Sequence, residues 1–453
     1  MNSDRPTAFS NALIVALLAS ILITIDIARG TFVVGSPDGG WVYGYLQPLR
    51  MTPILVAALA TAIACLALIV CGGRVEGRIW QRFLLWSIVG VTIQVLIRSL
   101  APFSLEQIFV SEGANSFYTV TRRYYASTVL REFDTLRASW PQHAQSNMPG
   151  KLMLIYALKD IARASSILPW LVIGVSNLGV FPMYWFARDL FGDARIALWS
   201  AALYLIVPAK LFFFPLMNTV TPVIVLTCAC LVMRWLATGK TVYATALGAA
   251  LYGLVFFEPT PLVVGIVFAT LLVRAIRDRT ISWRQGLWQS LAGISAFVVM
   301  YLIVRRWTGF NLLTAFSAIG ADAVEFNRMA GRPYGIWVWQ NPWDFAIGMG
   351  TCQAVLAVAV LWQGLVECRR TGTCSAATWL SASLLGSLLA IDLLGVNRGE
   401  VVRLWIFLAC FLQIPAAYFC ARLDSRVAFA LVLAVTIFQG ALGTAMIGFV
   451  LPG

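Results

Sequence analysis

Among the few ionisable side chains of this sequence, Glu112 is the one best placed to act as a base. It comes shortly after an apolar stretch and precedes a segment of helical composition, 116–133. A carboxylate just outside an apolar segment can accept the proton of a hydroxyl group while that group attacks an activated carbon. The alternative is a solvated acid that complements the dipole at a helix N-terminus. The sequence leaves both interpretations open.

Several basic side chains could hold a phosphate group near that carboxylate, because Lys and Arg pair readily with phosphate oxygens. Lys151 ends the segment 147–151, Asn-Met-Pro-Gly-Lys, and His143 is the single histidine. Lys210 lies inside an apolar stretch, where a charge is costly and usually functional. For Lys151 and Lys210 the alternative is an amine that extends to a membrane surface, and for His143 it is a polar loop contact.

A late segment, 397–403, reads Asn-Arg-Gly-Glu-Val-Val-Arg. Glu400 and Arg403 in it are one helical turn apart, so they could form a structural ion pair or part of a binding site. Glu258 stands at the tip of a short hairpin of apolar segments and could face the same cavity. The candidate site residues are Glu112 as the base and Lys210, Arg403, Glu400, Arg398, Lys151, His143, Glu258 and Arg122 as substrate-binding residues.

The histidine and cysteine content argues against a metal site. A single histidine excludes a histidine pair or a histidine-based metal cluster. The nine cysteines lie in apolar segments or in an Arg-rich loop near Cys368 and Cys374, without metal-type spacing. We therefore expect packing thiols rather than disulfides or metal ligands, and no cofactor.

The composition is typical of an integral membrane protein. Of the 453 residues, 60% are hydrophobic and only 12% are charged, whereas a soluble protein carries about twice that charged fraction. No long polar stretch separates a soluble part, so we interpret 1–453 as a single membrane domain. The net charge of +13 comes from Arg in short loops, which is the positive-inside pattern, and it does not indicate binding to nucleic acid.

Apolar stretches of about 20 residues, the length of a membrane-spanning helix, recur along the chain. We expect an all-α polytopic fold with about thirteen transmembrane helices. Their approximate ranges are 11–34, 52–71, 83–103, 167–188, 195–214, 218–237, 242–257, 260–275, 286–306, 345–366, 375–395, 402–421 and 426–449.

The distribution of Arg predicts the orientation of these helices. Arg-rich loops, such as 72–82 and 276–285, alternate with charge-poor loops along the whole series. The Arg-rich loops should be cytoplasmic, which places the N-terminus inside and the long loops 104–166 and 307–344 outside.

Loops as long as these two usually fold into elements of their own. In the first we expect two helices that lie in the membrane interface, 116–133 and 151–163. The second is rich in aromatic residues, which predicts either interfacial anchoring or a lid that faces the substrate.

The loop 104–166 resembles the first outer loop of the membrane-embedded C-type (GT-C) glycosyltransferases. In the branch with the protein O-mannosyltransferases and the lipid A aminoarabinose transferase, that loop reads roughly Asp-Glu-x-x-Tyr and later His-Pro-Pro-Leu. In this sequence Ser111-Glu112 replaces the acidic pair, Tyr118 lies further downstream, and Met-Pro-Gly at 148–150 replaces the double proline.

The resemblance covers roughly 83–240 in architecture, together with 397–405, which is similar to a Gly-Glu-x-x-Arg element of some members. It implies a glycosyltransferase-like module over 83–453, preceded by two extra N-terminal helices in 1–72. Such a protein of the plasma (inner) membrane would transfer a sugar from a polyprenyl-phosphate donor to a glycan, lipid or protein acceptor on the outer face, with inversion. Glu112 would deprotonate the acceptor. The residues themselves, independently of the resemblance, offer Lys210, Arg403 and the pair Arg305-Arg306 as cations that could hold the leaving phosphate, and we choose Lys210 and Arg403.

Two other functions stay open. A transporter or flippase for a lipid-linked substrate would use intramembrane acids such as Asp26 and Asp392. It would need polar groups through the whole depth of the membrane, whereas in this chain they concentrate outside. An O-antigen-type polymerase or ligase also has large outer loops with essential Arg, although its main loop usually comes late in the chain.

Overall fold

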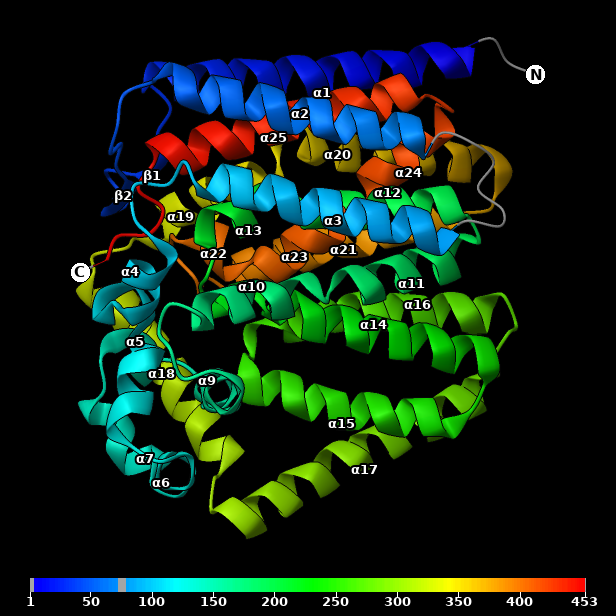
Figure 1. Ribbon diagram of the computed structural model, residues 1–453. Coiled ribbons are helices and arrows are strands. Elements are labelled where there is room, and N and C mark those ends of the chain that lie inside the picture. The colour runs from blue at the N-terminus through cyan, green and yellow to red at the C-terminus, as the bar shows by residue number, and fades with distance from the viewer. Residues whose placement is uncertain (1–3, 72–78, 453) are drawn as a thin grey trace.

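The computed structural model describes residues 4–71 and 79–452. Long helices run side by side, and short helices, a small hairpin and the C-terminus gather at one end of the bundle (Figure 1). Within the described ranges, eleven helices are long and apolar enough to cross a membrane, and two shorter apolar helices are Thr241–Phe257 and Ile406–Arg422. The polytopic helical fold of an integral membrane protein is therefore confirmed, while the exact count of thirteen crossings stays a prediction.

Helices make up most of the described chain, with a pair of short strands near the N-terminus. The first part of the chain forms α1 (Asp4–Arg29), β1 (Val34–Ser36), β2 (Trp41–Tyr43), α2 (Met51–Val70), α3 (Ile79–Arg98), α4 (Leu105–Val110), α5 (Glu112–Arg123), α6 (Ala126–Arg131), α7 (Phe133–Leu136), η1 (Arg137–Ser139), α8 (Gln142–Gln145), α9 (Gly150–Ile161), α10 (Leu168–Asn177), α11 (Val180–Phe191), α12 (Ala194–Leu205) and α13 (Pro208–Phe213). The second part forms η2 (Met217–Thr219), α14 (Thr221–Thr238), α15 (Thr241–Phe257), η3 (Thr260–Val264), α16 (Gly265–Arg277), α17 (Trp283–Thr308), α18 (Leu312–Met329), α19 (Tyr334–Met349), α20 (Thr351–Thr371), α21 (Ala376–Leu393), α22 (Val401–Leu404), α23 (Ile406–Phe411), α24 (Gln413–Arg422) and α25 (Arg426–Met446).

The core of the bundle lies around α12, α13 and α23, whose residues are almost all buried. Helix α12 packs against α3, α11 and α24. Proline at the start of α13 separates it from α12, because Pro208 has no N–H to continue the hydrogen-bond ladder. By contrast α17 lies at the periphery and packs mainly on α15. Its outward-facing apolar side chains suit contact with lipid.

A β-hairpin joins the first two long helices, and the sequence analysis did not predict it. Strands β1 and β2 pair antiparallel, with Val34 opposite Tyr43 and Ser36 opposite Trp41. The turn contains Gly39 and Gly40, and Gly40 has a φ of +76°, which a glycine adopts without strain. The hairpin packs on α19, so the two N-terminal helices bring a structured element to the end of the bundle.

The first long loop is more finely divided than expected. The prediction of one helix over 116–133 is wrong, because the structure has α5, α6 and α7 there. The chain is extended at Tyr124, with φ −128° and ψ 157°, where the backbone oxygen accepts a hydrogen bond from the Tyr156 hydroxyl. The second predicted helix, 151–163, corresponds to α9.

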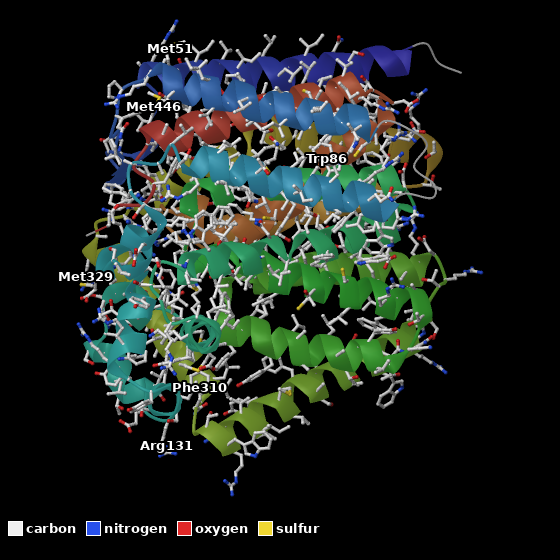
Figure 2. The ribbon with its side chains drawn as sticks, viewed as in Figure 1. Met51, Trp86, Arg131, Phe310, Met329 and Met446 are labelled. Atoms are coloured by element: carbon white, nitrogen blue, oxygen red, sulfur yellow. A yellow bond between two sulfur atoms is a disulfide. The ribbon has the colours of Figure 1, made fainter. Side chains whose placement is uncertain are left out.

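The second long loop is also helical, since α18 and α19 fill most of 307–344. Phe310, just before α18, contacts Phe133 of α7 and Phe256 of α15 edge to face, with ring centroids 5.3 and 5.4 Å apart. Figure 2 labels Phe310 beside Arg131, at the end of the bundle where the short helices lie. The two long loops therefore pack into one helical layer over that end.

Two cysteines contradict the expectation of packing thiols. Cys368 and Cys374 form a disulfide with their Cα atoms 4.7 Å apart, and the other seven cysteines are free. The separation of six residues between these two cysteines matches no metal-binding spacing, and nothing else in the sequence indicated that they pair. Disulfides persist in oxidising compartments, so this bond conflicts with a cytoplasmic place for the loop between α20 and α21.

Labelling of introduced cysteines in intact cells decides the orientation. Most of the loop 72–82, which the Arg distribution places in the cytoplasm, lies outside the described residues, so exposed positions elsewhere are used. Ala138→Cys should react with an impermeant maleimide and Thr280→Cys should not, with the unchanged protein as the background control. Protection of residue 138 together with labelling of residue 280 would reverse the predicted orientation.

Candidate functional site

Glu400 is the centre of an ion cluster at the end of the bundle that carries the hairpin. Its carboxylate accepts hydrogen bonds from Arg332 at 2.9 Å and from Arg403 at 2.5 Å. The three side chains are only 14%, 5% and 15% exposed. Burial alone raises the pKa of Glu400, but the charges of Arg403 and Arg332 outweigh it and hold the pKa below its usual value. This carboxylate therefore stays ionised.

The turn before α22 directs Glu400 toward the two arginines. Glu400 has a left-handed backbone, with φ 59° and ψ 14°, which costs free energy in a residue with a side chain. A Cβ on the preceding Gly399 would lie 2.9 Å from the ring of Trp337, so only glycine fits. The Asn341 side chain accepts from the Gly399 N–H at 3.0 Å and donates to the Asn397 carbonyl at 2.9 Å.

Arg398 braces this turn and does not contact the Glu400 carboxylate. Its guanidinium donates to the carbonyls of Arg332 at 3.0 Å and Gly395 at 3.1 Å. Arg332 donates in return to the carbonyl of Arg398 at 2.7 Å. The geometry gives Arg398 a positioning contact with the cluster, and its predicted role as a substrate ligand stays a prediction.

His143 of α8 connects the first long loop to the cluster. Its Nε2 atom lies 3.4 Å from Nη1 of Arg403. Burial, followed by the positive charge of Arg403, lowers the pKa of His143 to about 4, and Lys151 adds to the effect. The imidazole is therefore uncharged near neutral pH and can accept a hydrogen bond.

A second buried ion pair lies close to the first cluster. The Nζ atom of Lys151 is 3.3 Å from Oε2 of Glu258, with both side chains at most 5% exposed. Glu258 also accepts hydrogen bonds from Asn218 at 3.2 Å and Thr221 at 2.5 Å. Burial lowers the pKa of Lys151, although Glu258 opposes that shift, and the charge of Arg403 lowers it further. The two ion clusters therefore share one electrostatic environment.

Close contact between α9 and α15 makes the second ion pair possible. A Cβ on Gly150 would lie 2.6 Å from the carbonyl oxygen of Phe256, so glycine lets the two backbones meet. Lys151 follows directly and also donates to Asn147 at 2.8 Å. The Met-Pro-Gly turn seen in the sequence thus places a lysine beside the acid that ends α15.

The β-hairpin covers the Glu400 cluster from the side of α19. The Gly35 N–H donates to Oδ1 of Asp344 at 3.0 Å, and Trp337 donates to the Gly39 carbonyl at 2.9 Å. The guanidinium of Arg332 lies 5.2 Å from the ring of Trp41. The sequence reasoning missed this contribution, although Asp-Gly-Gly followed by Trp-Val-Tyr is a turn and strand signal.

The structure brings five of the predicted site residues into two neighbouring contact groups, and Arg398 braces one of them through Arg332. Arg403, Glu400 and His143 form one contact group, and Lys151 and Glu258 form its neighbour.

Glu112 is the first residue of α5, more than half exposed, with its carboxylate 3.6 Å from Arg123. Arg122 is exposed. Lys210 is fully buried in the core, where its Nζ atom lies 3.8 Å from the ring of Tyr204 and 3.4 Å from Oδ1 of Asn177.

Sequence reasoning also missed Arg332 as the second partner of Glu400. The sequence feature that could have identified Arg332 is its position between Gly331 and Pro333, in an outer segment rich in aromatic residues. Asn218 and Thr221, which hold Glu258, had no signal of their own, because uncharged side chains near helix starts are common. Within 4–71 and 79–452, no group of three or more His, Cys, Asp or Glu side chains could hold a metal ion.

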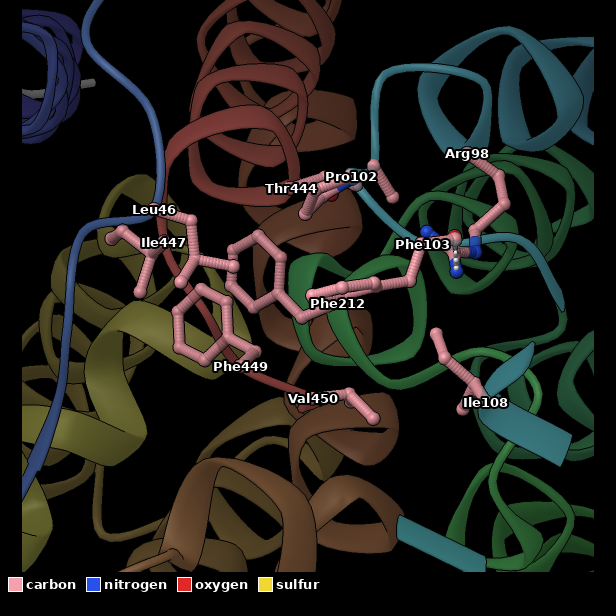
Figure 3. Close-up of a pocket in the computed structure, with 11 residues that line it drawn as sticks. Leu46, Arg98, Pro102, Phe103, Ile108, Phe212, Thr444, Ile447, Phe449 and Val450 are labelled. Atoms are coloured by element: carbon pink, nitrogen blue, oxygen red, sulfur yellow. Dashed lines mark hydrogen bonds between the residues drawn. The ribbon is translucent and has the colours of Figure 1, made fainter. Parts of the chain in front are cut away.

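Two cavities lie apart from the ion clusters. A small one of about 20 Å³, the space of about one water, lies beside Arg98, Phe212 and Phe449 (Figure 3). A larger one of about 340 Å³ lies between α3, α10 and α11 and has Asn177 among its mainly apolar lining residues. Cavities of this size can hold small molecules or parts of lipid chains.

No family model and no curated protein matches the sequence. Among solved structures the chain is similar to ArnT from Cupriavidus metallidurans, the lipid A aminoarabinose transferase. The match to the form bound to undecaprenyl phosphate has a TM-score of 0.45 and 14% identity over 77% of this chain and 61% of that chain. The match to the apo form has a TM-score of 0.46 and 15% identity over 75% of this chain and 59% of that chain. The chain spans about three fifths of the length of ArnT, and a likeness this distant assigns no residue roles.

Replacement of either member of the buried pair Lys151–Glu258 should destabilise the protein. Glu258→Gln or Lys151→Met leaves a buried charge without its counter-ion, which typically costs about 3–5 kcal/mol. The double variant should lose less than the sum of the two. Thermal unfolding of the purified proteins measures this coupling. Strictly additive losses would show that the two side chains do not interact as an ion pair.

Stability should also depend on the protonation of His143. Because an unfolded histidine titrates near 6.5, the unfolded state binds a proton between pH 6.5 and 4 that the folded state excludes. Stability present above pH 6.5 is therefore lost as the pH falls through that window, by at most about 3 kcal/mol. The Tm of the wild type should fall more steeply from pH 7 to 5 than that of His143→Gln. Parallel curves would contradict the low pKa.

Proposed function

We propose that this protein is a membrane glycosyltransferase that transfers a sugar from a polyprenyl-phosphate donor to an acceptor hydroxyl at the end of the bundle that carries the ion clusters. The observation that supports this function best is the collection of Arg332, Arg403 and Lys151 around two carboxylates, Glu400 and Glu258. Three cations against two anions leave one positive charge in excess, which favours an anionic ligand.

The reaction gives these cations a specific task. The acceptor oxygen forms a bond to the anomeric carbon from the face opposite the phosphate, and the bond between that carbon and the phosphate oxygen breaks. The electron pair goes to the leaving phosphate, whose negative charge grows as a phosphate monoester forms. Fixed cations stabilise such developing charge. Arg403, 15% exposed in its side chain, is the cluster cation best placed to meet the phosphate.

The surroundings of the three candidate acids support Glu112 as the base that takes the acceptor proton. Glu400 is held by two guanidinium groups with a lowered pKa, which makes it a weak proton acceptor. Glu258 is buried and accepts from three partners. Glu112 is exposed and has one cation at 3.6 Å. It also precedes Gly113, whose backbone hydrogen-bonds to His143 beside Arg403.

A second candidate function is translocation of a lipid-linked substrate. The observation that favours it is the polar group of Lys210, Asn177 and Gln94 inside the membrane-spanning region, next to the cavity of about 340 Å³. Intramembrane polar groups often mark a substrate pathway. Lys210 has aromatic and amide partners, however, and these satisfy it without a substrate.

Transfer by the purified protein should depend on Glu112. With a polyprenyl-phosphate sugar and a membrane extract as the source of acceptors, mass spectrometry should detect a new glycosidic product and free polyprenyl phosphate. Glu112→Gln keeps the shape of the side chain but removes the proton acceptor, so the rate should fall by about 10²–10⁴.

The matched control is Glu132→Gln, which changes an exposed acid in the same loop and should leave the rate unchanged. Full activity of Glu112→Gln would assign the base to another residue. Translocation of the intact donor, without any covalent product from a panel of donors, would contradict the glycosyltransferase function.

A further inference from the structure

Buried polar atoms without a partner gather beneath the β-hairpin. Within the described residues these atoms are the Tyr43 hydroxyl, the indole N–H of Trp41, Oδ2 of Asp344 and the Nε atoms of Arg332 and Arg403. Tyr43 is 6% exposed and Asp344 is 1% exposed. Buried polar groups are nearly always hydrogen-bonded, so a group of unpartnered ones at one place calls for an explanation.

These residues form one neighbourhood. The rings of Trp41 and Tyr43 meet edge to face with centroids 5.8 Å apart, and Arg332 lies over Trp41. Arg332 joins Arg403 through their shared partner Glu400.

The Tyr43 hydroxyl lies within the electrostatic reach of all the charged members of this group. Burial, then the charges of Glu400 and Asp344, raise the pKa of Tyr43 far above its usual value, although Arg403 and Arg332 oppose them. Tyr43 is therefore a neutral O–H group at neutral pH.

The atoms left without partners indicate the chemistry of a ligand. Four of them are N–H or O–H groups, and one is a carboxylate oxygen. The unpartnered Oδ2 of Asp344 would repel a phosphate, whereas a hydroxyl group can both donate and accept. A sugar ring offers several hydroxyls together with a C–H face that packs against aromatic rings, as Trp41 and Tyr43 could provide.

From this arrangement we infer that the unpartnered polar groups under the hairpin recognise the sugar of the donor through hydrogen bonds with the Tyr43 hydroxyl and Oδ2 of Asp344. This inference rests on the proposed glycosyltransferase function and adds the residues that select the sugar. The ligand approaches from the side of Glu400 and Arg403, whose side chains are 14% and 15% exposed. Its phosphate then stays near Arg403 while the ring hydroxyls face the hairpin.

A site of this kind discriminates strongly between sugars that differ in one hydroxyl group. A ligand that lacks the matching hydroxyl leaves a buried donor or acceptor unpaired, which penalises binding more than the loss of apolar contact does. The specificity would therefore come from the N-terminal hairpin, while the cations that meet the phosphate come from the later segments of the chain.

Tyr43→Phe tests the inference because it removes only the hydroxyl. The assay compares the binding of two kinds of radiolabelled probe to the purified full-length protein. One probe is bare undecaprenyl phosphate, and the others are undecaprenyl phosphate linked to each of several hexoses and pentoses. The variant should bind the glycosylated lipid that the wild type prefers about tenfold more weakly. Its affinity for bare undecaprenyl phosphate should not change.

Tyr45→Phe is the matched control, since its hydroxyl donates to the Phe32 carbonyl at 2.9 Å in the same segment, and its affinity for both probes should equal that of the wild type. Asp344→Asn is the second variant, because it keeps Oδ1 for Gly35 but turns the Oδ2 acceptor into a donor. It should weaken binding of the glycosylated probe alone, and unchanged Tm values would show that both variants fold.

The inference is overturned if Tyr43→Phe and Asp344→Asn bind the glycosylated probe as the wild type does. It is also overturned if they lose affinity for both probes equally, or if the wild type does not distinguish the two. Sugar-dependent binding that both variants lose, without any transfer product, would support sugar recognition by Tyr43 and Asp344 and contradict the enzymatic function. The two hypotheses can therefore fail separately.

Discussion

Glu400 between two guanidinium groups is the interaction on which the rest of the candidate site depends. A buried carboxylate is costly unless it is paired and hydrogen-bonded, and Glu400 is paired on both oxygens, by Arg332 and Arg403. To reach that position its backbone enters the left-handed region. Neighbouring contacts must outweigh this strain, and Asn341 and the glycine before Glu400 supply them.

The same pairing connects parts of the chain that are far apart in sequence. Arg332 comes from the turn between α18 and α19, and Arg403 comes from α22. Arg403 meets His143 of the first long loop, and Arg332 meets Trp41 of the hairpin. The end of the bundle is therefore a single charged layer in which loss of one cation changes the electrostatic environment of the others.

The bundle beneath this layer explains why the ion clusters lie at its end. In a hydrocarbon environment irregular backbone is tolerated only where protein buries it, so turns and short helices collect beyond the apolar helices. Lys210 is the departure from this pattern. It lies in the core between α13 and its neighbours, where the ring of Tyr204 and the amide of Asn177 satisfy it.

Local pattern predicted some contacts in the candidate site and not others. Glu400 and Arg403 lie one helical turn apart, so the spacing allowed a pair between them, and the structure forms it with a left-handed backbone at Glu400. Lys151 and Glu258 were both recognised as candidates, but their contact was not predicted, because it needs α9 and α15 to touch at Gly150. The prediction of one helix over 116–133 was wrong. The chain is extended at Tyr124, and its backbone carbonyl accepts a hydrogen bond from the hydroxyl of Tyr156, 32 residues away, a contact that the local sequence does not specify.

The sequence by itself determined the class of the protein, the positions of its apolar helices and the segments that carry ionisable groups. Those features are local, since helix length and hydrophobicity are set by consecutive residues. Only the tertiary structure decided that Lys151 meets Glu258, that Tyr204 and Asn177 enclose Lys210, and that a hairpin near the N-terminus covers Glu400. The burial and pairing of charged side chains depend on segments that meet only when the chain folds. The linear sequence does not specify which of its few charged side chains are buried next to each other.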